Sequence, residues 1–264
     1  MSFLAYPASS AFARFGKASV ILPRGLLLRS PARAKAVQSS GFSLVELLTV
    51  LTIIAILTSI AIVSLVGTKS SRDLANASYS IQGVLEQART FAMASSTYTW
   101  VGFFEEDPAN PGTAGIGQVV ISIVSSANGM NLDTVGSPIP QLPAASLTQV
   151  AKLLKIPNLH LAVLSAAAVP TRTTVPPATY QVASTSFANT TNFLYPITGT
   201  AQYTFTKIIQ FNPQGDATRI ADYPTQLIEI GLQPTHGNSI GATGTDFAAI
   251  QIAGIGGQVI TYRP

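Results

Sequence analysis

The longest apolar run in the chain covers residues 42–66. It holds 25 residues without glycine or proline, and Glu46 is its one charged residue. A helix of that length is about 37 Å long, more than the ~30 Å hydrocarbon core of a bilayer. The pattern therefore predicts a tilted transmembrane helix over residues 42–66. A carboxylate in such a segment is unfavourable in lipid, which indicates that Glu46 has a partner outside the segment.

The following residues, 67–96, keep a helical period but become amphipathic. Apolar side chains recur there at spacings of three or four residues: Leu74, Ala77, Ile81, Leu85, Ala88 and Ala92. Such a stripe is typical of a helix with one face on a core. We expect one helix over residues 42–96, with its second half packed on a sheet.

Beyond residue 97 the pattern changes to that of short strands separated by turns. The expected strands cover residues 97–104, 118–125, 159–163, 201–211, 226–232, 247–252 and 258–262, the last two forming a hairpin around residues 253–257. A short helix is expected over residues 146–156, with Ser146 as its N-cap and Pro157 just beyond its end. One long helix followed by antiparallel strands predicts an α+β fold with a β-rich head over residues 97–264.

The charge distribution separates residues 1–41 from the rest. These residues contain six Lys or Arg and no acid, whereas residues 42–264 contain nine basic and 11 acidic residues. The basic segment keeps the N-terminus in the cytoplasm by the positive-inside rule and sends the C-terminal head across the membrane. Since the remainder has a formal charge of −2, the basic pI does not indicate nucleic-acid binding. The chain has no cysteine, so disulfides and thiolate metal sites are excluded.

The start of the apolar run carries a recognisable motif. Gly41-Phe42-Ser43-Leu44-Val45-Glu46, followed by the apolar stretch, resembles the processing signal of type IV prepilins and type II secretion pseudopilins. The resemblance implies removal of leader 1–41 by prepilin peptidase between Gly41 and Phe42, and N-methylation of Phe42. It assigns Glu46 to pairing with the N-terminus of a neighbouring subunit. The leader is longer than many of the family, with Ser39 and Ser40 where a Lys or Arg is common, so an uncleaved signal anchor is the alternative.

The resemblance also implies a shape and a set of partners. The expected form is a pilin-like lollipop, single-pass in the inner membrane with a periplasmic or extracellular head. Its partners would be the lipid bilayer, other pilin-like subunits and an inner-membrane assembly platform. Residues 84–94, 209–215 and 256–260 are similar to segments of H-type minor pseudopilins, and to the D member of the prepilin-like Verru_Chthon cassette.

Residues for catalysis or cofactor binding are sparse. The two histidines, His160 and His236, are isolated and read as structural, and no nucleophile, phosphate or dinucleotide motif occurs. We expect neither enzymatic activity nor a cofactor. Glu105, Glu106 and Asp107 are weak candidates for Ca²⁺ ligands, although a solvated turn explains them better.

The expected function is therefore structural. The chain would assemble as a minor subunit of a type II secretion pseudopilus or a type IV pilus-like fibre. The competing interpretation is a membrane-anchored binding module that never polymerises.

Overall fold

The computed structural model describes residues 41–133, 139–187, 191–219, 222–224, 226–240 and 246–263, with the backbone alone described at residues 60–70. The chain divides after Leu51 into two units. The leader predicted at residues 1–41 lies, except for Gly41, outside the described residues.

Helix α1 runs from Leu44 to Ala94, close to the predicted range of 42–96. Ser43 starts it, because its hydroxyl accepts a hydrogen bond from the Val45 backbone N–H at 3.3 Å. At the other end Ser96 adopts a left-handed conformation with φ of 49°, and the Thr97 N–H bonds back to the Ala92 carbonyl. A residue in this conformation cannot continue the helix.

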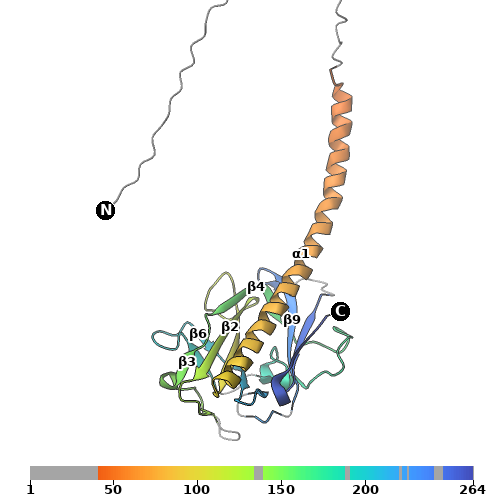
Figure 1. Ribbon diagram of the computed structural model, residues 1–264. Helices are drawn as coiled ribbons and strands as arrows, with labels where there is room; N and C mark the ends of the chain where they lie inside the picture. Colours follow the sequence, from red (N-terminus) through yellow and green to blue (C-terminus); the bar gives the residue numbers. More distant parts are fainter. Residues whose placement is uncertain are drawn as a thin grey trace, which may run out of the picture. The chain divides into compact units, whose positions relative to one another are not determined.

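The second half of α1 lies across a large sheet (Figure 1). All six residues of the predicted stripe are buried: Leu74, Ala77, Ile81, Leu85, Ala88 and Ala92. They share one core with the sheet residues Val101, Ile121 and Ile230. The amphipathic prediction for this part of the helix is confirmed.

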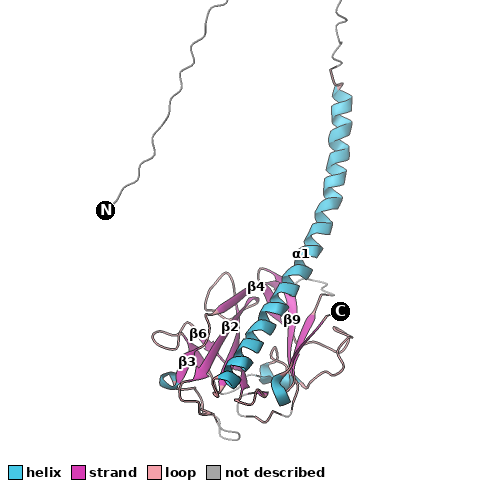
Figure 2. Cartoon of the chain, in the orientation of Figure 1, coloured by secondary structure: helices cyan, strands magenta, loops and turns pink. Residues whose placement is uncertain are grey.

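Beyond α1 the regular secondary structure is mainly β-strand (Figure 2). Their bounds are β1 Thr99–Glu106, β2 Gly117–Ser126, β3 Leu147–Gln149, β4 Leu154–Leu161, β5 Phe193–Tyr195, β6 Tyr203–Phe205, β7 Lys207–Phe211, β8 Ala217–Arg219, β9 Ile228–His236, β10 Ser239–Ile240, β11 Ala248–Ile252 and β12 Val259–Tyr262. In the described part of the chain, ten of them form one sheet in the order β12-β11-β9-β4-β2-β1-β7-β8, with β3 beside β2 and β10 beside β9. Each pairing is antiparallel, which confirms the α+β class.

The sheet buries side chains on both faces, because successive residues of a strand point to opposite sides. In β1, Val101 and Phe103 contact the α1 core, while Trp100 lies in a second core on the other face. This second core is covered by the separate β5–β6 hairpin, whose Phe193 and Phe205 rings stack with centroids 4.9 Å apart. Gly102 makes this approach possible, since a Cβ there would lie 2.6 Å from both aromatic side chains.

The predicted helix over residues 146–156 is wrong. After a 3₁₀ turn at Ala144–Ser146, the chain forms β3 and then β4, both paired with β2. The apolar spacing of this segment also fits a strand, and pairing with the buried β2 satisfies its backbone groups. Leu147 enters the second core and Ile156 the first.

Two other strand predictions need adjustment. The strand expected over residues 159–163 begins earlier, at Leu154, and ends at Leu161. The strand expected over residues 201–211 is divided at Thr206, because β6 pairs with β5 whereas β7 pairs with β1. The hairpin around residues 253–257 is confirmed by the pairing of β11 with β12.

Candidate functional site

The predicted processing site lies directly before α1. Gly41 and Phe42 are both exposed, and Phe42 keeps 79% of its surface accessible. No atom lies within 4 Å of the position that a Cβ on Gly41 would occupy. Both residues that flank the predicted cut are therefore exposed.

Glu46 lies in the first turn of α1 and is exposed. A carboxylate at this position interacts favourably with the positive end of the helix dipole. Ser43 and Glu46 have the spacing of a capping box, but the Glu46 carboxylate makes no hydrogen bond or ion pair with any residue that the structure describes. It remains free to meet a positive charge from another molecule.

Around Glu46 the helix exposes large apolar side chains on all its faces. The exposed set is Phe42, Leu44, Val45, Leu47, Leu48, Val50, Leu51, Ile53, Ile54, Ile56 and Leu57. A helix that is hydrophobic all round is stable only when it is covered by protein or lipid.

Among the residues whose side chains are described, no helix combines the length and the hydropathy required for a membrane crossing. The predicted span of 42–66 extends into residues 60–66, whose side chains lie outside the described part.

The three carboxylates considered for Ca²⁺ are each engaged by protein donors. Glu105 accepts a hydrogen bond from His160 Nδ1. Asp107 accepts bonds from the Ala109 N–H at 2.9 Å and from Asn110 Nδ2 at 2.8 Å, which close the turn after β1. Within the described ranges, no group of three or more acidic or histidine side chains is placed to hold a metal ion.

Glu106 is the most buried of the three, with a side chain 1% exposed. Its carboxylate accepts bonds from Gly112 N–H at 2.6 Å, Lys155 Nζ at 2.9 Å and Tyr203 O–H at 2.8 Å. Burial alone would raise the pKa of Glu106, but these donors outweigh it and hold the pKa below its ordinary value. The cluster ties β1, β4 and the β5–β6 hairpin together.

The remaining polar residues of interest shape the fold. His236 ends β9 and pairs with Ser239 in the β9–β10 ladder. Asp216 accepts bonds from Asn212 Nδ2 at 3.0 Å and from the Gly256 N–H at 2.8 Å, so it links the turn before β8 to the turn before β12. His160, for which the sequence predicts a structural role, lies on β4, and its Nδ1 atom bonds to Glu105 of β1.

One buried ion pair was not predicted from the sequence. Arg172 and Glu229 have side chains 1% and 0% exposed, and their Nη1 and Oε1 atoms are 2.5 Å apart. Gln251 donates to the second Glu229 oxygen at 2.7 Å. The pair fastens the loop after β4 to strand β9. A charged residue inside the apolar run 228–232 was the available signal, but its partner is 57 positions away.

Comparison with protein families identifies the N-terminal segment. The family described as the prokaryotic N-terminal methylation motif matches residues 38–62. This N-terminal segment is prepilin-like. This match covers Gly41, Phe42 and Glu46, and it supports the chain as a substrate of prepilin peptidase. No curated protein and no solved structure matches the chain.

Proposed function

We propose that this prepilin-like chain is a structural subunit of a type II secretion pseudopilus or a type IV pilus-like fibre. Prepilin peptidase removes leader 1–41 and methylates Phe42. The apolar start of α1 anchors the subunit in the inner membrane, with the head on the periplasmic or extracellular side. An assembly platform then transfers the subunit from the membrane into the fibre.

The observation that carries this proposal is the exposed apolar surface of residues 42–57 around Glu46, whose carboxylate has no partner among the described residues. Lipid covers such a surface before assembly, and the helices of other subunits cover it afterwards. In either environment an isolated carboxylate is unfavourable, whereas a carboxylate paired with the N-terminal amine of a neighbour is compensated. The pairing would therefore favour the assembled state over the dispersed one.

We further propose that the chain is a minor subunit. The segments that resemble H-type pseudopilins meet at one place in the head. Arg89 Nε donates to the Gly215 carbonyl at 3.4 Å, and a Cβ on Gly257 would lie 2.2 Å from the same oxygen. The three segments that carry the resemblance therefore pack against one another, which supports reading the resemblance as one feature of the head.

Glu46→Ala tests the assembly role. The variant should still be cleaved at Gly41, but its cross-linking to pilin-like subunits in native membranes should fall at least tenfold. Glu86→Ala is the matched control, because Glu86 lies on the same helix outside the apolar stretch and pairs with Arg89 on the surface. If Glu46→Ala assembles like the control, the assembly role of Glu46 is wrong and an anchored, non-polymerising binding module becomes the better account.

A further inference from the structure

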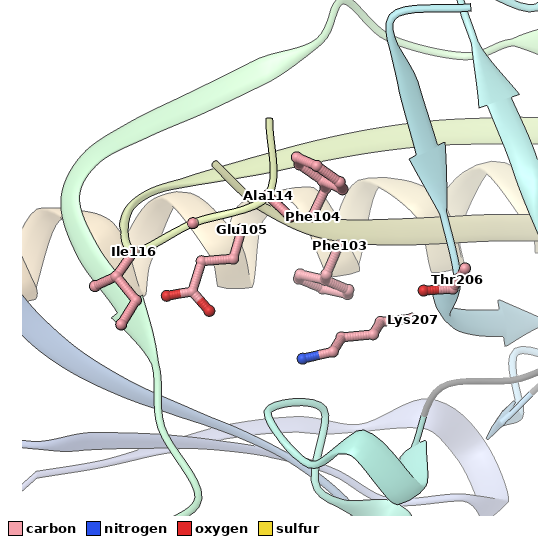
Figure 3. Close-up of a pocket in the computed structure, with 8 residues that line it drawn as sticks. Phe103, Phe104, Glu105, Ala114, Ile116, Thr206 and Lys207 are labelled. Atoms are coloured by element: carbon pink, nitrogen blue, oxygen red, sulfur yellow. The ribbon is translucent and has the colours of Figure 1, made fainter. Parts of the chain in front are cut away.

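A surface pocket of about 410 Å³ lies at the end of β1, away from the N-terminal motif. It is lined by Phe103, Phe104, Glu105, Ala114, Gly115, Ile116, Thr206 and Lys207. Figure 3 shows the Lys207 side chain extending toward the Glu105 carboxylate, next to the Phe103 ring. Pockets of this size, with apolar walls and a few charged groups, are typical of small-molecule sites.

Strand register places Lys207 and Glu105 on the same face of the sheet as Phe103. Phe103 on β1 is directly opposite Lys207 on β7, so their side chains share one face of the sheet. Glu105 is two residues further along β1 and therefore on the same face as Phe103. Lys207 and Glu105 are thus diagonal neighbours, whose Cα atoms are typically about 7–8 Å apart. They form no ion pair with each other among the described residues.

Lys207 keeps unused hydrogen-bonding capacity. Its ammonium donates to the Ala183 carbonyl at 3.0 Å, and no other acceptor within the described ranges uses its two remaining protons. Burial lowers the pKa of Lys207, and the negative charge of Glu105 opposes this only in part. An anion placed in the pocket would therefore compensate a poorly solvated cation.

The Glu105 carboxylate also has an oxygen without a hydrogen-bond partner among the described residues. Its Oε1 atom accepts the bond from His160 Nδ1, while Oε2 has no hydrogen-bond partner in the described part of the chain. The side chains of Glu105 and His160 are 18% and 19% exposed. A second donor, such as an ammonium group, could therefore bind Oε2 without disturbing the bond to His160.

We propose that this pocket binds an apolar α-amino acid in its zwitterionic form. Lys207 receives the ligand carboxylate, and Glu105 receives its ammonium group. The ligand side chain lies against Ala114 and Ile116. A simple anion would be repelled by Glu105 and a simple cation by Lys207, so the juxtaposition of both charges selects a molecule that carries both. This site is independent of the assembly function.

Isothermal titration of the full chain in detergent micelles tests the assignment with three related ligands. L-Phenylalanine carries both charges, L-phenylalaninamide lacks the carboxylate, and N-acetyl-L-phenylalanine lacks the ammonium. We expect L-phenylalanine to bind and each analogue to bind at least tenfold more weakly, because loss of a charged hydrogen bond has about that effect. Equal affinity for all three ligands, or no binding of L-phenylalanine, would overturn the proposal.

Variants of Lys207 and Glu105 test which residue recognises the carboxylate of the ligand and which recognises its ammonium group. Lys207→Met should remove the preference for L-phenylalanine over the amide, and Glu105→Gln the preference over the acetylated form. Lys152→Met, at an exposed lysine outside the pocket, is the matched control and should bind as the parent does. Ala114→Phe places a ring on a residue that lines the pocket while keeping Lys207 and Glu105 in the sequence, and it should abolish binding. Unchanged selectivity in a folded Lys207→Met protein, or unchanged binding in Ala114→Phe, would show that the ligand binds elsewhere.

Discussion

Removing one partner of the buried Arg172–Glu229 pair should destabilise the head far more than removing a surface charge. In Arg172→Met, the Glu229 carboxylate retains a single hydrogen bond, from Gln251 at 2.7 Å, and stays fully buried. An uncompensated buried charge of this kind typically costs about 3–5 kcal/mol of stability. Arg172 also donates to the Val169 and Ser165 carbonyls, which lose a donor in the same variant.

The double variant Arg172→Met/Glu229→Met separates the interaction energy of the pair from the contacts that each residue makes with its surroundings. It leaves no buried charge at this site, so it should lose less stability than the sum of the two single variants, by at least about 2 kcal/mol. Glu86→Gln is the control. Its partner is Arg89 at 3.5 Å, both side chains are partly exposed, and the change should remain within about 1 kcal/mol.

Urea unfolding of the full chain in detergent micelles measures these differences. Trp100 is the single tryptophan of the sequence and is fully buried, so its fluorescence reports on unfolding of the head. Linear extrapolation then gives the free energy of unfolding for each variant. Strict additivity of the two single variants, or a cost of Arg172→Met no greater than that of Glu86→Gln, would refute the reasoning.

Two further predictions concern the sheet. Because the folded pKa of Glu106 is below its ordinary value of 4.5, the stabilisation from its donors is complete above about pH 4.5 and is lost as the pH falls through the folded value. The urea midpoint should therefore fall on acidification below that pH, and the fall should be smaller in Glu106→Gln; equal pH profiles would contradict this. Gly102→Ala places a Cβ 2.6 Å from Phe193 and Phe205 and should cost about 1–3 kcal/mol in the same assay, whereas an unchanged midpoint would show that the hairpin moves freely.

The sequence predicted those elements whose pattern is local. The stripe from Leu74 to Ala92 has a helical period and lies on the core, and the strands expected over residues 97–104 and 118–125 form β1 and β2. The apolar residues of 146–156 satisfy both a helical and a strand spacing. Their state was decided by pairing with β2, a contact that no local pattern reveals.

The candidate site residues also divide into those with a local sequence pattern and those set by contacts between distant segments. Gly41, Phe42 and Glu46 form one continuous motif and could be read directly. The three neighbouring acids 105–107 suggested one site, but strand alternation and the following turn direct them to different partners: His160, Lys155 and Asn110. Lys207 was missed because a single lysine at a strand start has no pattern of its own. Its role depends on the register with Phe103.

The account rests most directly on processing of the N-terminus. Intact mass and N-terminal sequencing of the protein extracted from its native membrane measure this. We predict a chain that begins at Phe42 and carries one additional methyl group. An intact leader, or a cut at another position, would contradict the assignment as a pilin-like subunit.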